Sequence, residues 1–354
     1  MADTHANSIY LGPDGKLAVR EVTETYVPEG SQSLVRVQYS GVNPCDLNFS
    51  YIGLNNFITG FELSGTVVET GPTSPFKVGD AVCGISPIGF PQLSSVGTHQ
   101  DLAIAEANLL YAVPAGLQLK DAGGIAMASQ TASDALFNEL GFGLSEGNVS
   151  GTDPKGHPIL IWGGASNVGS AAIQIAKSAG FNPIFATASP KNHDELKRLG
   201  ATHCFDYRSP LVVDDIQAAT KELGVSLTTA FDTVGKGSVP GEQNTPALTK
   251  AALSGATPED LNLVCTLPIP SDKAFKNCTS YRPSGSIGAM GTPQDPEAPI
   301  RVRKAMEYFL ASYERVVKIS AVTVVKGAEA GIREIERVAR GGASMEKVVI
   351  EHPL

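Results

Sequence analysis

The sequence predicts an α/β protein of two domains, in which a β-rich domain accompanies a doubly wound domain built on a parallel sheet. Three observations support this prediction. The chain has 354 residues, which is more than one domain usually holds. Short apolar segments separated by glycine and proline fill residues 1–112. From residue 159 onward, apolar strand candidates alternate with helix candidates, as in a parallel sheet covered by helices.

The first part of the chain carries three clear strand candidates. The segment SLVRVQYSGV alternates apolar and polar residues from Leu34, which is typical of a half-buried strand. Two further short strands are expected in FELSGTVVETG and VGDAVCGI. Short strands with frequent glycine and proline between them indicate a small barrel or sandwich.

The second part begins with a helix candidate, DAGGIAMASQTASDALFNELG, which is expected to end at Gly141. The segment ILIWGG follows and is apolar on both faces, as a central strand of a parallel sheet is. Three more strands are expected in NPIFATA, HCFDY and LTTAFDTVG, with helices in SAAIQIAKSAG, KNHDELKRLGA and VVDDIQAATKELG. A last long helix is expected in RVRKAMEYFLASYERVV, and the strand KVVIEH is expected to return to the first domain.

Composition and charge exclude several classes of protein. A net charge of −9 without a run of basic residues argues against a nucleic-acid partner. No apolar run reaches the roughly 18 residues of a membrane span, and the first residues lack the apolar core of a signal peptide. We therefore expect a cytoplasmic protein without a membrane partner. The five cysteines are odd in number and widely spaced, so we expect reduced, mostly buried thiols.

A cluster of small residues, GGASNVG, separates a buried strand from a helix at residues 163–169. A glycine-rich turn before a helix lets the backbone approach a pyrophosphate, and the helix N-terminus stabilises the negative charge. The turn departs from the usual G-x-G-x-x-G, and a tight turn without a ligand is the alternative. The candidate contacts are Gly164, Ser166, Asn167, Val168 and Gly169.

The end of the next strand candidate carries no acidic residue. Sites for NAD usually place an acid there, which holds the ribose 2′-hydroxyl and repels a 2′-phosphate. Here the chain has Ser189, Pro190, Lys191 and Asn192, and Tyr207 follows the strand after that. Lys191 can neutralise a phosphate, so NADPH is the expected cofactor. The alternative is a solvated lysine, although a helix start disfavours a cation.

With these residues the chain resembles the medium-chain dehydrogenase/reductase superfamily over nearly its whole length. The motifs SGVNPCDLN, GFELSGTVVETG, VGDAVCG, SPKN, LGATHCFDYR and AFDTVG occur in the order typical of that superfamily. Within it, the chain is most similar to the zinc-independent, fungal trans-acting enoyl reductases. Those enzymes use NADPH and reduce chains that are bound to the carrier protein of a partner polyketide synthase or polyketide synthase–peptide synthetase.

The resemblance implies a domain organisation and a reaction. A GroES-like catalytic domain would comprise residues 1–125 and 315–354, and a Rossmann NADPH-binding domain would comprise residues 126–314, with the active site in the cleft. The expected function is NADPH-dependent enoyl reduction of carrier-bound polyketide intermediates in secondary metabolism, by a monomer or homodimer.

The resemblance also assigns site residues. Asn48 and Thr131 would be catalytic, with Thr131 near the carboxamide of the nicotinamide. Further cofactor contacts would come from Cys45, Asp46, Leu47, Asn48, Thr266, Leu267, Ala343 and Ser344. The substrate would be faced by Thr131, Ala132, Ala135, Asn138, Ser286, Ile287, Gly288, Ala289 and Met290.

Zinc-binding members of the superfamily hold their catalytic metal with a cysteine and a histidine at positions that are Asn43 and Phe61 here. Cys45 lies two residues from the ligand position and is expected to be a small packed residue. The resemblance therefore implies no metal. We also expect Glu62 to pair within the first domain and His99 to be a satisfied polar residue.

The main departure from the family is Asn48, because enoyl reductases of this branch often have a lysine there, in N-P-x-D-W-K. An amide supplies neither a positive charge nor a proton. Three explanations stay open: water protonates the product, Tyr51 or Tyr39 does, or reduction has been lost. In the last case the protein would catalyse a non-redox cyclisation or isomerisation, or would serve as a non-catalytic nucleotide-binding accessory protein.

Overall fold

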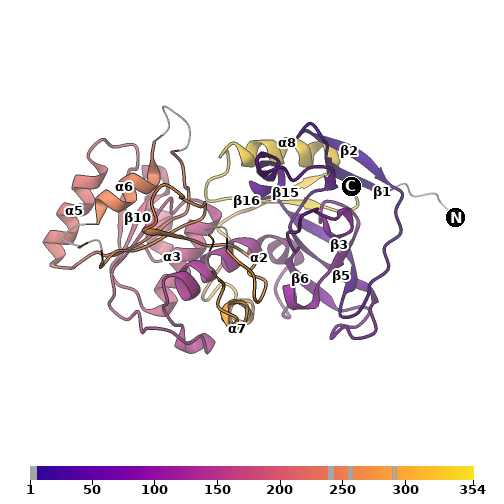
Figure 1. Cartoon of the computed structure of the whole chain (residues 1–354), viewed down its shortest axis with the longest axis horizontal. Helices are drawn as coiled ribbons and strands as arrows, with labels where there is room; N and C mark the ends of the chain where they lie inside the picture. Colours follow the sequence, from indigo (N-terminus) through magenta and orange to yellow (C-terminus); the bar gives the residue numbers. More distant parts are fainter. Residues whose placement is uncertain (1–5, 238–242, 254–256, 258, 289–290, 292) are drawn as a thin grey trace. The chain divides into compact units, whose positions relative to one another are not determined.

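The computed structural model describes residues 6–237, 243–253, 257, 259–288, 291 and 293–354. It contains two compact units, Met1–Met127 with Ile319–Leu354, and Ala128–Lys318 (Figure 1). The first unit is built mainly from antiparallel strands, and the second is a parallel sheet with helices. The predicted α/β fold class, with a β-rich domain and a doubly wound domain, is confirmed.

The second unit contains a six-stranded parallel sheet in the order β11-β10-β9-β12-β13-β14. The chain starts at the centre with β9, moves outward to β11, and then fills the other half from β12, which is the order of a dinucleotide-binding fold. All strand carboxyl ends therefore meet at one edge. The strands are β9 (Ile159–Trp162), β10 (Ile184–Thr187), β11 (His203–Phe205), β12 (Thr229–Asp232), β13 (Asn262–Cys265) and β14 (Phe275–Asn277).

Helices of this unit pack in pairs, α3 against α4 and α5 against α6. Their amphipathic patterns bury one face each, and Gly180 and Gly224 end α3 and α5 in the left-handed conformation. The helices are α3 (Asn167–Ala179), α4 (His193–Leu199), α5 (Val212–Leu223), α6 (Thr245–Ala252) and α7 (Ala298–Ala311). The strands and helices predicted from residue 159 to residue 232 are confirmed.

Two predicted helices differ in detail from the structure. The candidate that ends at Gly141 forms α2 (Leu119–Ser133) and continues as a π-helical turn, Asp134–Glu139. The long helix from Arg301 was predicted to reach residue 317, and this is wrong, because α7 ends at Ala311. Glu314 has a positive φ of 67°, which a helix does not allow, and Tyr313 forms a bridge to Val317.

The first unit contains a seven-stranded and a three-stranded sheet. The larger has the order β15-β16-β3-β5-β6-β8 with β7 also on β3, and the smaller is β2-β1-β4. Their strands are β1 (Ala6–Leu11), β2 (Leu17–Val22), β3 (Ser33–Gly41), β4 (Phe57–Ile58), β5 (Glu62–Thr70), β6 (Ala81–Ile85), β7 (Leu102–Ala105), β8 (Leu110–Ala112), β15 (Val322–Lys326) and β16 (Lys347–Glu351). The short helix α1 is Cys45–Asn48, and α8 is Ala328–Ala339. Among the described residues, no helix is long and apolar enough to cross a membrane.

The C-terminal strand returns to the first unit, as predicted. β16 pairs antiparallel with β3, and Ile350 lies opposite Ser40. Its apolar side chains join a buried cluster with Ile9 on β1 and Ile335 on α8. The same strand carries Lys347, which is fully buried and forms an ion pair with Glu62 on β5 at 2.7 Å. The expected pairing of Glu62 within this unit is confirmed.

Replacing Ile350 by alanine should therefore lower the free energy of unfolding by about 2–5 kcal/mol, because it leaves a cavity in a packed cluster. Ile300→Ala is the control, since Ile300 in α7 is 46% exposed and should change stability by about 0.5 kcal/mol or less. Denaturant unfolding measures both. Equal effects of the two variants would contradict the packing of β16.

Candidate active site

The turn after β9 approaches the start of α3 so closely that side chains are excluded. A Cβ on Gly169 would lie 2.3 Å from the carbonyl oxygen of Gly163 and 2.9 Å from Cα of Gly164. Gly163 itself has a φ of +83°, which disfavours any other residue. These glycines therefore allow the helix to begin directly at the edge of the sheet.

The side chain of Ser166 caps this helix, accepting a hydrogen bond from the N–H of Gly169 at 2.9 Å. Its hydroxyl also lies 2.9 Å from that of Thr233, at the end of β12. Asn167 and Val168 occupy the first two helical positions, where N–H groups have no partner within the helix. Neither of these two N–H groups donates a hydrogen bond to any of the described residues. The arrangement therefore suits a pyrophosphate, and these orphaned donors are what a dinucleotide would satisfy.

The second strand end places a cation beside this turn, on the same edge of the sheet. β10 ends at Thr187, whose hydroxyl accepts a hydrogen bond from the N–H of Gly163 at 3.0 Å. Ser189 follows, and Lys191 is exposed in the turn that leads into α4. The first acidic residue after β10 is Asp194, in the first turn of α4. These features fit a 2′-phosphate better than a free ribose hydroxyl.

Tyr207 follows β11 and is half buried against the core of the second unit. The guanidinium of Arg208 lies 5.4 Å from the centre of its ring. Arg208 is exposed, and it is a second cation at this end of the sheet that the sequence analysis missed. The sequence could have indicated this cation, because Arg208 directly follows the predicted contact Tyr207.

The π-helical turn Asp134–Glu139 is tied to a distant loop by buried charges. Arg282 is 7% exposed, and its guanidinium binds Asp134 at 2.6 Å and Glu139 at 2.5 Å. Asp134 also accepts the N–H of Thr279 at 2.8 Å. This cluster, which the sequence analysis missed, ties the π-helical turn to the segment Thr279–Arg282.

The predicted substrate residues differ widely in exposure. Ala132 and Ala135 are fully buried, Thr131 is 8% exposed, and Asn138 donates hydrogen bonds to Asp134 and to the carbonyl of Ala298. In the loop, Ile287 is 73% exposed next to Ser286 and Gly288. Ala289 and Met290 lie outside the described residues. Thr266 and Leu267 directly follow β13 and so share the sheet edge with the glycine turn.

In the first unit, the predicted cofactor residues form helix α1. Burial raises the pKa of the Cys45 thiol well above its usual value, so the thiol is neutral and packed. Leu47 packs beside the core, and Asp46 is fully buried. The amide of Asn48 donates to the carbonyl of Ala339, at the end of α8, at 3.4 Å. Ala343 and Ser344 lie in the turn between α8 and β16.

The two positions that hold zinc ligands in metal-binding relatives are occupied differently here. The side-chain oxygen of Asn43 accepts a hydrogen bond from Lys347 at 2.7 Å, and its amide donates to Glu62 at 3.2 Å. Phe61 packs edge to face against Phe49 and Phe57. Within the described residues, no group of three or more His, Cys, Asp or Glu side chains is placed to hold a metal ion. All five cysteines are free thiols, as predicted.

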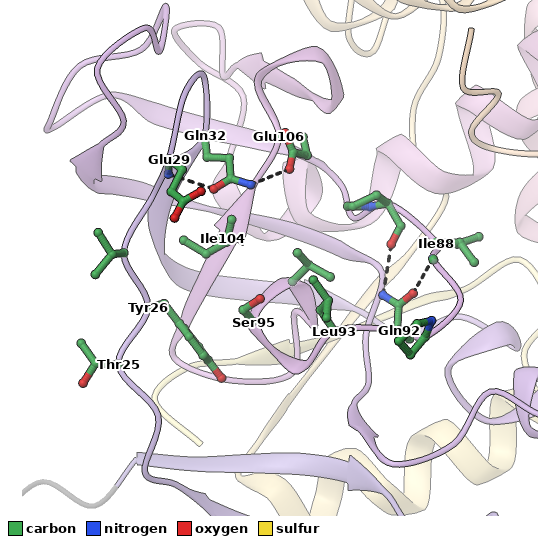
Figure 2. A pocket seen from close by; sticks show the side chains of 15 residues that line it. Thr25, Tyr26, Glu29, Gln32, Ile88, Gln92, Leu93, Ser95, Ile104 and Glu106 are labelled. Carbon is green, nitrogen blue, oxygen red and sulfur yellow. Dashed lines mark hydrogen bonds between the residues drawn. The ribbon is translucent and has the colours of Figure 1, made fainter. Parts of the chain in front are cut away.

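The first unit also has a hollow of about 450 Å³ (Figure 2). Gln32 links the N–H of Glu29 to the carboxylate of Glu106, and Gln92 donates to the carbonyl of Pro87. No predicted site residue lines this hollow. Both glutamines are thus engaged within the lining, and the hollow has no glycine turn at a helix start that would suit a dinucleotide.

Comparisons with known proteins agree with this geometry. Residues 29–115 match the model of the alcohol dehydrogenase GroES-like domain, and residues 167–241 match that of the zinc-binding dehydrogenase family. A trans-enoyl reductase of Gibberella fujikuroi is 33% identical over 220 residues, 59% of this chain and 59% of that protein. A trans-enoyl reductase of Pyricularia grisea is 32% identical over 221 residues, 62% of this chain and 59% of that protein. The match thus spans less than two thirds of these curated relatives.

Solved structures of low identity share the fold. An alcohol dehydrogenase superfamily protein from Novosphingobium aromaticivorans aligns with a TM-score of 0.73 at 22% identity, covering 99% of this chain and 100% of that chain. The CurK enoyl reductase aligns with a TM-score of 0.70 at 18% identity, covering 98% of this chain and 99% of that chain.

The glycine turn gives a direct prediction. Gly169→Ala should displace the start of α3 and abolish dinucleotide binding, because the new methyl group would meet backbone atoms at 2.3 Å and 2.9 Å. Ser170→Ala, at the next helical position, is the control and should bind normally. Fluorescence titration with NADPH and circular dichroism measure binding and folding. Unchanged affinity in Gly169→Ala would contradict the site.

Proposed function

We propose that this chain, which belongs to the medium-chain dehydrogenase/reductase superfamily, is an NADPH-dependent enoyl reductase that acts on carrier-protein-bound polyketide intermediates. The observation that carries the proposal is the glycine turn with two orphaned N–H groups, next to a strand end that has Lys191 and no acid. Relatives that bear the name trans-enoyl reductase support the reaction and the partner, a polyketide synthase or polyketide synthase–peptide synthetase.

The residues of the chain would have distinct tasks in this reaction. Bound NADPH supplies the hydride that adds to the β-carbon of the enoyl thioester. The N–H groups of Asn167 and Val168 would hold its pyrophosphate, and Ser189, Lys191 and Tyr207 would hold its 2′-phosphate. Thr131 and Asn48 would orient the nicotinamide carboxamide and the thioester carbonyl through neutral hydrogen bonds. Enoyl thioesters presented on a carrier protein, with NADPH absorbance as the readout, test the proposal.

Asn48 favours a second candidate function, a non-redox cyclisation or isomerisation on a polyketide-derived product. Its amide cannot replace the charge or proton of a lysine, and it already donates to the carbonyl of Ala339. The hydroxyl of Tyr51, which the sequence analysis considered as a donor, belongs to a side chain that is 86% exposed. Product formed in stoichiometric amount without NADPH oxidation would support this candidate over reduction.

Lys191→Ala should weaken NADPH binding by about ten- to a hundredfold, because a charge-assisted contact contributes roughly 1.5–3 kcal/mol. NADH binding should not change, since NADH lacks the 2′-phosphate. Lys197→Ala is the matched control, because Lys197 is an exposed lysine within α4 and outside the predicted phosphate pocket. Fluorescence titration with NADPH and with NADH measures the affinity of each variant. Equal affinity of the wild type for NADPH and NADH would rule out the phosphate pocket.

Asn48→Lys should leave enoyl reduction unchanged or raise it, because a lysine adds the charge that the enolate intermediate requires. A positioned general acid contributes about 10²–10⁴-fold in other enzymes, which sets the upper range of the gain. Asn48→Ala is the control that removes the amide without adding charge. The rate of NADPH oxidation measures both. A large loss in Asn48→Lys would mean that the site depends on the neutral amide.

A further inference from the structure

Five side chains of the first unit form an unbroken row of hydrogen bonds between the surface and helix α1. We call this row the Asp101–Asp46 chain; it consists of Asp101, His352, Ser40, His99 and Asp46. The two outer contacts join an imidazole to a carboxylate, each at 3.1 Å. The two inner contacts join an imidazole to the hydroxyl of Ser40, each at 2.8 Å. Ser40, His99 and Asp46 are fully buried, whereas the side chain of Asp101 is 23% exposed.

The number of hydrogens in this row can be counted from its contacts. A ring nitrogen that faces an ionised carboxylate must carry a hydrogen, so two of the four ring nitrogens do. The hydroxyl of Ser40 has one hydrogen and can donate to only one imidazole, so the other imidazole must donate to it. Three of the four ring nitrogens therefore carry a hydrogen. Two neutral imidazoles have only two N–H hydrogens between them, so one hydrogen more is needed. The row is satisfied when it holds one additional proton.

The inner end of the row, at Asp46, is shielded from solvent. Asp46 is fully buried, and among the described residues no donor reaches its Oδ1. The nearby pair of Lys347 and Glu62 is balanced within itself at 2.7 Å, so it adds no net charge beside Asp46. A buried carboxylate requires a paired cation or a proton.

The other titratable groups agree with this placement. The Cys45 thiol beside Asp46 is neutral, because burial raises its pKa. Burial also lowers the pKa of His352, against the opposing effect of Asp101, so the outer ring tends to be neutral. A proton that enters from solvent at Asp101 is therefore passed inward.

We propose that the Asp101–Asp46 chain is a proton relay, which stores one proton and delivers it to Asp46 in α1. Transfer needs only that Ser40 accept a hydrogen from one imidazole and donate its own to the other. The relay rests on the proposed function for its destination, because α1 carries Asn48 and the predicted cofactor contacts. In each turnover the β-carbon would gain a hydride from NADPH, and the α-carbon would gain the proton that the Asp46 carboxyl releases. His99 would then re-protonate Asp46 from its Nε2–H, across the 3.1 Å contact. Water would then return one proton through Asp101.

The stored proton can be measured without any reaction. In protein labelled with ¹⁵N-histidine and ¹³C-aspartate, NMR at pH 7 should show one additional proton on the rings or carboxyls of the row. Asp101→Asn should remove it, since an amide can donate to the imidazole of His352 and satisfies the row with two neutral rings. If the wild type shows two neutral imidazoles and two ionised carboxylates, the row does not hold an additional proton and the proposal is wrong.

The delivery of the proton is tested by turnover. Ser40→Ala breaks the row at its centre and should lower kcat at least about tenfold, with unchanged NADPH affinity and a larger solvent isotope effect. Ser64→Ala is the matched control, because Ser64 is a buried serine of neighbouring β5 whose hydroxyl donates to the carbonyl of Leu119, outside the row. If Ser40→Ala does not fold, Asp101→Asn at the partly exposed end of the row replaces it. It should likewise lower kcat and raise the solvent isotope effect, with unchanged NADPH affinity.

The two proposals fail in different ways. If the wild type does not oxidise NADPH with enoyl thioesters, the proposed function fails, while the NMR titration still decides whether the row stores a proton. If the wild type turns over and both Ser40→Ala and Asp101→Asn keep its kcat and isotope effect, the relay is wrong.

Discussion

The contact between Gly169 and the turn after β9 is the constraint on which the proposed site depends. Because a Cβ at residue 169 would lie 2.3 Å from the carbonyl oxygen of Gly163, the helix can reach the sheet edge only with glycine there. This close approach directs the N–H groups of Asn167 and Val168 toward the edge where the carboxyl ends of β9, β10, β12 and β13 meet. The predicted phosphate contacts and the residues after β13 are positioned by that same edge.

The first unit contains a buried ion pair between two of its strands. Lys347, on the strand that returns from the C-terminal part, binds Glu62 and Asn43, and Asn43 occupies a position that carries a zinc ligand in metal-binding relatives. Breaking such a pair leaves an uncompensated buried charge, which costs about 3–5 kcal/mol in other proteins. The ion pair and the Asp101–Asp46 chain together join β3, β5, β16 and α1.

The fold was largely predictable because local patterns agreed with it. The alternation of strands and helices from residue 159, the small residues at 163–169 and the apolar run KVVIEH each have a direct physical meaning. The end of α7 was misjudged, since the apolar spacing continues through Tyr313 although Glu314 takes a left-handed conformation. The Arg282 cluster and the Asp101–Asp46 chain could not be predicted, because their members lie up to 312 residues apart and carry no local pattern. His99 was expected to be satisfied, and the structure confirms this.

The central claim is that this protein transfers hydride from NADPH to an enoyl thioester. The most direct test uses NADPH that carries deuterium at the transferred position, an enoyl thioester on its carrier protein, and mass spectrometry of the product. The proposed function predicts a product that gains one deuterium at the β-carbon and one proton from solvent at the α-carbon. A product that forms in full yield without deuterium, while NADPH stays reduced, would contradict it.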